Sequence, residues 1–401
     1  MLEAVKRYIK DNRFEIFISF FIFTNLFPAW FPQFMYYISF VLIFWKMQLF
    51  HPRFNGKTGL FICFIIYLWI SSFVGQVFDL RLVLFSIILY LAAPRNSVKW
   101  YLYKVKLLTS IFIGFGIATL ANFYAKLAGI NLVYRDEYAM MMGRISEFSG
   151  FCSHSMWTSC AAAFSTMFFI SMVFRRVQKN NVQRYACFVM VVISLYITMI
   201  GASRSSFFLS LACSLLIIWM QSKKIDIVRN LFAVGLIAVI VTPFLIENSK
   251  AMLSKKNGLE ITTKNTSRDE LWSQRMDEFK SSPVFGIGFA AHGVGVNKKV
   301  GRYESGGSFI AVLAQAGVIG ILFIFIIWLS AMQMPSSLGY NSDMIVVYAG
   351  FAFMSIHSIV EGYMFQAGWY LCLIIWLTLG VMIEHKQMKN KLSWIAISSR
   401  Q

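Results

Sequence analysis

Long apolar runs, separated by short polar segments, divide this chain from one end to the other. A helix needs about 20 apolar residues to cross the hydrocarbon core of a bilayer, with a usual range of about 17–25. The candidate segments are residues 14–31, 33–49, 58–77, 80–94, 107–128, 156–174, 185–202, 206–221, 231–247, 308–330, 344–360 and 367–384. They predict an all-α, polytopic integral membrane protein with about twelve transmembrane helices.

The composition supports a membrane protein and argues against a nucleic-acid-binding one. Hydrophobic residues make up 58% of the chain and charged residues only 14%, whereas soluble domains average about 25% charged residues. The formal net charge is +19, but the basic residues are scattered between the apolar runs, as expected for the loops of a membrane protein. The six cysteines show neither a disulfide framework nor metal-ligand spacing. No removable signal peptide is indicated.

Lysine and arginine are concentrated in alternate connections between the apolar runs. With the N-terminus placed in the cytoplasm, the inner segments carry basic clusters within residues 6–13, 46–57, 95–106, 175–184, 223–229 and 386–400. The short outer loops near residues 32 and 366 carry none. Because basic short loops stay in the cytoplasm, the pattern predicts that both termini are cytoplasmic. We expect one transmembrane domain over residues 1–401.

Two of the predicted outer segments are long. They cover residues 129–155 and, between the ninth and tenth spans, residues 248–306, which hold ten basic residues. The second contains a capping box, Ser267-x-x-Glu270, and reaches Pro283 after a helical stretch. A short helix is therefore predicted near residues 267–280, resting on the membrane surface.

Arg204 is the first candidate for a binding residue, because it lies in the stretch IGASRSSFFL at the predicted outer end of the seventh span. An arginine at the centre of a membrane helix costs about 2.5–3.5 kcal/mol. A snorkelling anchor at the interface is the alternative explanation. Two features favour binding: Arg135, Arg144, Arg268 and Arg275 lie on the same predicted face, and small residues surround Arg204.

A cluster of outer arginines indicates an anionic ligand. The guanidinium group binds phosphate oxygens in a bidentate manner. Nucleotide sugars and ATP are not expected outside the cell, so a lipid-linked pyrophosphate is the candidate ligand. The adjacent pairs Asp136-Glu137 and Asp269-Glu270 point apart on a helix, so neither a metal site nor a cofactor is predicted. Arginines would then stabilise the departing pyrophosphate.

Glycosyl transfer to a hydroxyl group also requires a base. Glu304, just before the tenth span, and His292, in GFAAHGVG, are the candidates on the outer face. The alternative for both is an ordinary loop residue. His154 and His357 fit structural roles better, and Glu361 is a weaker candidate.

Three stretches together resemble the superfamily of O-antigen ligases and Wzy-type polysaccharide polymerases. GRISEFSGFCSHSMWTS looks like a family segment before a span, with Glu147 where a glycine is usual. IGASRSSFFL is similar to a Thr-Gly-Ser-Arg turn at a span end. The third stretch resembles the signature outer loop and following span: an arginine, Leu-Trp, Pro-x-x-Gly-x-Gly, and a span with Gly-x-x-Gly. The resemblance covers roughly residues 130–330.

The resemblance implies an inverting, metal-independent glycosyl transfer from undecaprenyl pyrophosphate, on the outer face of the bacterial cytoplasmic (inner) membrane. By position, the two arginines that grip the pyrophosphate are Arg204 and Arg268, with Arg275 as an addition. Ligases carry a His-Asn or similar pair before the Gly-x-x-Gly span. Here Gly306-Gly307 stands at that place and Glu304 is the nearest usable base, which favours a polymerase.

The sequence thus predicts a membrane glycosyltransferase that polymerises lipid-linked repeat units of a surface polysaccharide, such as O-antigen, capsule or exopolysaccharide. Its partners would be undecaprenyl-pyrophosphate-linked donor and acceptor glycans, membrane lipids and a chain-length regulator, but no nucleic acid. A ligase that transfers glycan to the lipid A core is the alternative. A flippase or other transporter fits less well, because no two related halves are seen and the charges cluster on one face.

Overall fold

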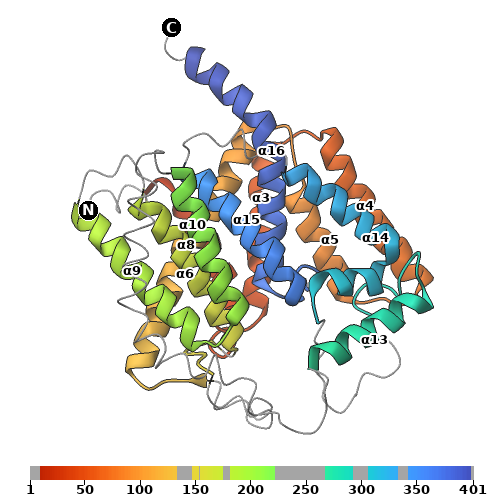
Figure 1. The fold of residues 1–401 in the computed structure, drawn as a ribbon. Helices are drawn as coiled ribbons and strands as arrows, with labels where there is room; N and C mark the ends of the chain where they lie inside the picture. The colour runs from red at the N-terminus through yellow and green to blue at the C-terminus, as the bar shows by residue number, and fades with distance from the viewer. Residues whose placement is uncertain are drawn as a thin grey trace. The chain divides into compact units, whose positions relative to one another are not determined.

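The computed structural model describes residues 10–132, 147–152, 154–174, 181–221, 267–291, 306–332 and 342–398. Apart from an isolated bridge between Arg53 and Asn96, these ranges contain no extended pairing, which confirms the predicted all-α fold (Figure 1). Their helices are α2 (Arg13–Thr24), α3 (Phe34–Phe50), α4 (Gly56–Val74), α5 (Leu80–Ala92), α6 (Val98–Leu127), α8 (Ser155–Val173), α9 (Asn181–Ile200), α10 (Arg204–Gln221), α13 (Ser267–Ser281), α14 (Ser308–Met332), α15 (Ser342–Val360) and α16 (Tyr370–Ser398).

The described helices follow the predicted spans closely. Eleven of the twelve predicted spans coincide with a helix, and the ninth, residues 231–247, lies outside the described residues. Seven described helices are long and apolar enough to cross a membrane, and α3, α5 and the first part of α16 are shorter apolar helices. The chain is therefore a multi-pass membrane protein. A further helix, α13, covers the stretch where a surface helix is predicted.

The start of α6 differs from the prediction. The basic residues of segment 95–106 were expected in an inner connection, but α6 begins at Val98 and includes Lys104 and Lys106. Lys104 is fully buried. Its ammonium group lies 2.9 Å from a carboxylate oxygen of Glu384 on α16, and this opposite charge allows a lysine to lie inside a helix bundle.

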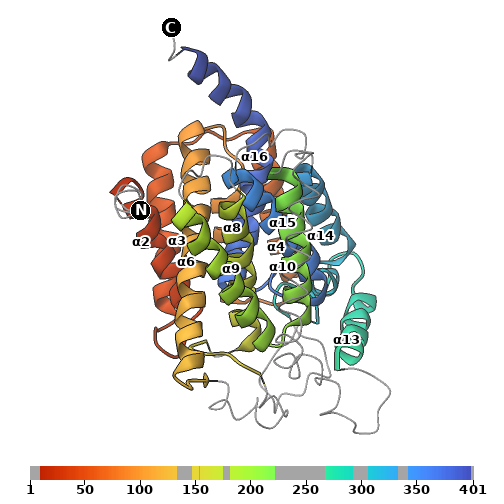
Figure 2. The ribbon, with the colours of Figure 1, turned by 60° about the vertical axis from the view of Figure 1, so that its left-hand side comes forward.

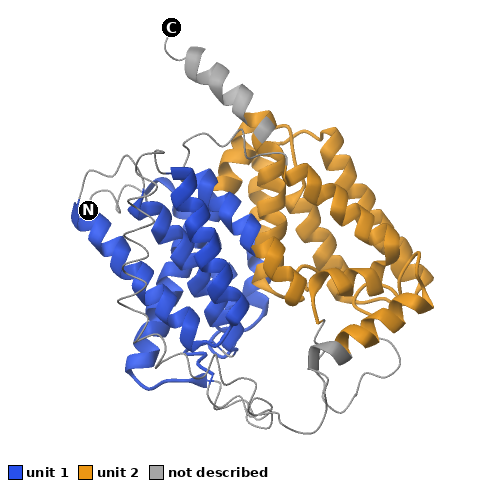
Figure 3. Cartoon of the chain, in the orientation of Figure 1, with its two compact units in different colours: residues 1–39, 106–261, 339–353 blue, residues 40–105, 262–338, 354–401 orange. Residues whose placement is uncertain are grey.

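The chain divides by its internal contacts into two compact units (Figure 3). Unit 1 consists of residues 1–39, 106–261 and 339–353, and unit 2 of residues 40–105, 262–338 and 354–401. Of the predicted outer segment 129–155, the structure describes residues 129–132, 147–152 and 154–155, and of segment 248–306 it describes residues 267–291 and 306.

Helix α8 is the central helix of unit 1, where α9 and α10 pack against it (Figure 2). Its consecutive residues Ala161–Ala163 are fully buried, and such small side chains let neighbouring helices approach closely. Polar bridges add to the packing. The hydroxyl oxygens of Ser165 and Ser194 are 2.7 Å apart, and the Gln221 amide donates to Ser171 Oγ at 2.9 Å.

Aromatic rings fill the centre of unit 2, among α4, α5, α14 and α16. The ring centroid of Phe85 lies 4.9 Å from that of Phe365, 5.0 Å from Phe289 and 5.6 Å from Trp376. Such offset and edge contacts stabilise aromatic pairs beyond the burial of their area. Phe289 comes from the loop that follows α13, so this loop is part of the core of the unit.

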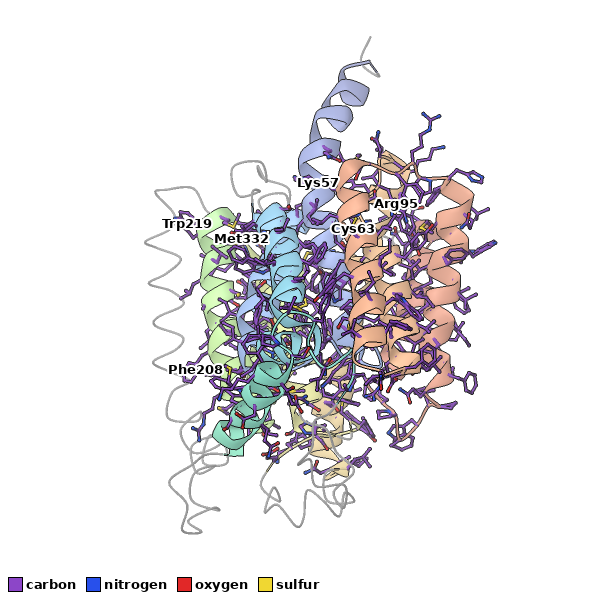
Figure 4. The ribbon with its side chains drawn as sticks, turned by 90° about the vertical axis from the view of Figure 1, so that its right-hand side faces the viewer. Lys57, Cys63, Arg95, Phe208, Trp219 and Met332 are labelled. Carbon is purple, nitrogen blue, oxygen red and sulfur yellow. The ribbon has the colours of Figure 1, made fainter. Side chains whose placement is uncertain are left out.

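A buried ionic cluster lies at the end of unit 2 that carries Lys57 and Arg95, opposite α13 (Figure 4). The side chains of Lys104 and Glu384 are both 0% exposed. The backbone N–H of Arg95 donates to the same Glu384 oxygen at 2.6 Å, and the Arg95 guanidinium lies over the rings of Phe54 and Tyr90 at 4.3 and 4.6 Å. The cluster ties α16 to the connection between α5 and α6.

Large apolar side chains project from the outer faces of the helices in both units. Phe208 and Trp219 are exposed on α10, as are Cys63 on α4 and Met332 on α14 (Figure 4). Exposed apolar surface of this extent is unfavourable in water and expected where a helix contacts lipid.

Candidate functional site

The Arg204 turn, residues 201–204, connects α9 to α10 in unit 1. Only Gly201, Ala202 and Ser203 lie between the two helices. Ala202 adopts a left-handed φ of 57°, and a Cβ atom on Gly201 would fall on the Ser159 hydroxyl of α8. The small residues before Arg204 therefore serve the close packing of the turn against α8, in addition to any space they leave around the guanidinium.

The side chain of Arg204 is exposed at the first position of α10. The N-terminus of a helix carries a partial positive charge, so a cation there is unfavourable by a few tenths of a kcal/mol. Ser203 caps the helix through its hydroxyl, which accepts a hydrogen bond from the Ser206 N–H. The position disfavours a cation for stability but suits an anionic ligand, which helix N-termini attract.

The segment 147–152 is docked onto this turn. The backbone N–H of Phe148 donates to the carbonyl oxygen of Ile200 at 3.2 Å. Asn131 braces the segment from the other side, since its side chain donates to the Glu147 carbonyl at 3.0 Å and accepts from the Ser149 N–H at 2.9 Å. The outer-loop motif is thus hydrogen-bonded to the last residue of α9, which leads directly into the Arg204 turn in unit 1.

Glu147 is a residue of this region that the sequence analysis did not count among the site candidates. Its side chain is only 4% exposed, and its carboxylate accepts a hydrogen bond from the hydroxyl of Ser155, the first residue of α8. A carboxylate is favourable at a helix N-terminus. The sequence signal was the resemblance described above, in which Glu147 stands where a glycine is usual. His154 caps the same helix, where its Nδ1 accepts from the Met156 N–H at 3.1 Å.

Helix α13 carries the second group of predicted arginines, in unit 2. The Arg275 guanidinium donates to the Glu278 carboxylate at 2.6 Å, and the two side chains are only 5% and 8% exposed. A diphosphate bound by Arg275 would have to share this guanidinium with Glu278. The backbone of Arg268 belongs to the first turn of α13, but its side chain lies outside the described residues.

The Pro-x-x-Gly-x-Gly motif, residues 283–288, fills a break in α14. The helix is interrupted at Gly317, which has a φ of 62°. At this break the backbone N–H groups of Ile287 and Gly288 donate to the carbonyls of Ala314 and Gln315 at 2.9 and 3.1 Å. The backbone carbonyls freed by the break are therefore satisfied by the loop, as buried backbone requires.

Helix α4 completes this arrangement from the other side. The Ser71 hydroxyl donates to the Phe285 carbonyl at 2.6 Å, and the Tyr67 hydroxyl donates to the Ala316 carbonyl, also at 2.6 Å. Buried carbonyl groups need hydrogen-bond donors from within the protein. The Ser71 and Tyr67 hydroxyl groups are such donors. The glycine motif thus has a structural role: it attaches the C-terminal end of α13 to α14 and α4.

Two glycines of this loop–helix contact should not tolerate a side chain. Gly286 has a φ of 73°, and a Cβ atom there would fall on the backbone of Gln315; a Cβ on Gly317 would fall on the carbonyl of Val284. We expect Gly286→Ala or Gly317→Ala to lower the free energy of unfolding by about 2–3 kcal/mol, measured by denaturant unfolding in detergent.

The matched control is Gly59→Ala in the interior of α4, where an added Cβ meets no atom within 4 Å. Alanine in a helix interior is about 0.5–1 kcal/mol better than glycine, so this variant should be slightly more stable. Equal effects at all three positions would contradict the assigned role of the loop.

The remaining predicted site residues, Arg135, Arg144, His292 and Glu304, lie outside the described residues. Their roles stay predictions, as do those of Arg204, Arg268 and Arg275. Within the described part of the chain, no group of three or more His, Cys, Asp or Glu side chains is arranged to hold a metal ion.

Comparison with known families identifies a region of the sequence that contains both the Arg204 turn and α13. Residues 189–325 match the family model described as O-Antigen ligase. This range includes the Arg204 turn, α10, α13, the glycine loop and the broken part of α14. No curated protein and no solved structure matches the chain.

Proposed function

We propose, from the O-antigen ligase domain that residues 189–325 carry, that this chain is a membrane glycosyltransferase which polymerises undecaprenyl-pyrophosphate-linked repeat units on the outer face of the bacterial inner membrane. The observation that carries the proposal is that one family domain spans both the Arg204 turn and α13, the two places where arginines were predicted to hold a pyrophosphate.

In the proposed mechanism, Arg204 and Arg268 hold the donor pyrophosphate through bidentate hydrogen bonds. Glu304, or His292 in its place, accepts the proton of an acceptor hydroxyl group. The hydroxyl oxygen attacks the anomeric carbon, the bond from that carbon to the pyrophosphate oxygen breaks, and undecaprenyl pyrophosphate leaves with the electron pair. Because attack and departure are in line, the anomeric configuration inverts.

The other predicted arginines have supporting roles in this proposal. Arg135 and Arg144 precede the docked segment 147–152 in the sequence, and we assign them additional positive charge for the pyrophosphate. Arg275 contributes further positive charge while its guanidinium stays paired with the Glu278 carboxylate at 2.6 Å. Positive groups at these places stabilise the charge that develops on the leaving pyrophosphate, so no divalent cation is required.

The test uses purified protein and a lipid-linked repeat unit as the sole substrate. The proposal predicts a ladder of longer lipid-linked glycans, formed in the presence of EDTA and without nucleotide. Two results would contradict the proposal: no extension of the lipid-linked repeat unit, or extension only when nucleotide or metal is added.

A second candidate function is ligation of the glycan to the lipid A core, which the description of the matched family favours. The two functions share the donor and differ in the acceptor. Purified protein offered a lipid-linked glycan together with both acceptors distinguishes them. A polymerase extends the lipid-linked unit, whereas a ligase produces a core-linked glycan and leaves the length of the donor glycan unchanged.

A further inference from the structure

We propose that Trp272 is a positioning residue. It fixes the orientation of α13 relative to the start of α14, and this orientation determines where the arginines of α13 lie. The inference rests on the proposed function, in which Arg268 holds the donor pyrophosphate. It assigns a role to an aromatic residue that does not itself touch the substrate.

The contact between Trp272 and Gly306 is both polar and steric. The indole Nε1–H donates to the Gly306 carbonyl oxygen at 2.6 Å. Gly306 has a φ of 69°, and a Cβ atom on it would lie 2.8 Å from Trp272 Cδ1, so the ring lies directly against the glycine. Trp272 as a whole remains 38% exposed, so burial alone does not account for its position.

The segment to which Trp272 binds is itself firmly held. Ser308, the first residue of α14, donates through Oγ to the Glu361 carbonyl at 2.7 Å and accepts from the Met364 N–H at 3.1 Å. Both partners belong to the connection between α15 and α16. Residues 306–308 are therefore anchored to a third part of unit 2 and provide a fixed support for α13.

The geometry of α13 explains why this support matters. Its C-terminal end at Ser281 continues into the glycine loop, which is fixed to α14 and α4 through the hydrogen bonds described above. A helix held at one end can pivot about that end, and a second attachment removes this freedom. Trp272 provides one about 14 Å along the helix axis from Ser281, at about 1.5 Å per residue.

The two described arginine positions on α13 lie at different distances from the pivot. Arg275 is about 9 Å from Ser281 along the axis, and Arg268 is about 20 Å from it. A pivoting helix would therefore displace Arg268 most. Because a misplacement of about 1 Å can cost a large part of a catalytic rate, the Trp272–Gly306 contact bears on catalysis chiefly through Arg268.

The test compares Trp272→Phe with Trp69→Phe. Phenylalanine keeps an aromatic ring and removes the indole N–H. Trp69 is a matched control in the same unit, because it is also 38% exposed and its Nε1–H donates to Ser86 Oγ at 3.0 Å. We expect Trp272→Phe to lower kcat for ladder formation about 5- to 10-fold, with little change in KM, and Trp69→Phe to leave both unchanged.

A second measurement reports on the direction of α13 without using activity. Spin labels are placed at residues 270 and 322, on α13 and α14, in a cysteine-free background, and the distribution of distances between them is measured. Trp272→Phe should broaden this distribution, and Trp69→Phe should not.

The outcomes test the positioning role of Trp272 separately from the proposed glycosyltransferase function. An unchanged distance distribution in Trp272→Phe overturns the positioning role, as does an unchanged kcat when the wild-type protein forms a ladder. A fall in kcat accompanied by loss of protein from the membrane, with no broadening, identifies a merely structural residue and also overturns it. If the wild-type protein forms no ladder, the proposed function fails, and the distance measurement alone judges the role of Trp272 in directing α13.

Discussion

Glu384→Gln should destabilise the protein more than any other single change considered for unit 2, by about 3–5 kcal/mol in the free energy of unfolding. The substitution removes the charge that compensates Lys104, whose ammonium group lies 2.9 Å away and is fully buried. The Lys104 ammonium would keep only neutral partners, such as the Ala92 carbonyl at 3.3 Å, and these do not offset the cost of burying a charge. Denaturant unfolding of the detergent-solubilised protein measures the change.

Two further variants make this expectation specific to the buried pair. The double variant Lys104→Met with Glu384→Met should be far less destabilised than Glu384→Gln, because replacing a buried ion pair by apolar residues is often neutral. Asp277→Asn breaks the pair with Lys280 on α13, where both side chains are 68% exposed, and should cost less than about 1 kcal/mol. Equal losses for Glu384→Gln and Asp277→Asn would contradict the assignment.

Arg204→Ala should lower the rate of ladder formation by at least about 100-fold, the usual cost of removing one donor to the charge that develops in a transition state. The protein should remain folded in the membrane, because the side chain is exposed and lies at an unfavourable place for a cation. Lysine at this position should restore only part of the rate, since an ammonium group does not form the bidentate contact. Initial rates with purified protein measure both changes.

Arg184→Ala on α9 is the matched control for Arg204→Ala. Its Nε–H donates to the Val173 carbonyl at 3.0 Å, and it lies at the opposite end of α9 from the Arg204 turn. It should keep nearly the full rate. If Arg204→Ala also kept the length and amount of polymer, Arg204 would be a membrane anchor, the alternative that its sequence context leaves open.

Most of the helix positions could be predicted because the length of an apolar run is a local property of the sequence. The start of α6 shows the limit of this reasoning. Lys104 interrupts the apolar pattern, but its charge is compensated by Glu384, a residue 280 positions later in the chain. Local hydropathy contains no information about such a partner, so the helix starts nine residues before the predicted span, at Val98.

The glycine motif shows a similar limit for the candidate site. The sequence indicates that residues 283–288 permit an irregular backbone, and Gly317 stands out within a span. Only the fold shows that the loop 283–288 fits into the break of α14 at Gly317. The backbone hydrogen bonds between them join segments about thirty residues apart in the sequence. The pairing of Arg275 with Glu278 was accessible to sequence reasoning, since residues three apart on a helix are neighbours.

Labelling with a membrane-impermeant thiol reagent tests the central claim most directly, namely that Arg204 and Arg268 face the same exterior surface. Single cysteines are placed at residues 204 and 268 of a cysteine-free protein, and at Arg53, an exposed residue of the predicted inner face, as the control. We predict that cysteines at 204 and 268 react in intact cells and that the cysteine at 53 reacts only after permeabilisation. Reaction of 204 and 268 from opposite sides of the membrane would contradict the account.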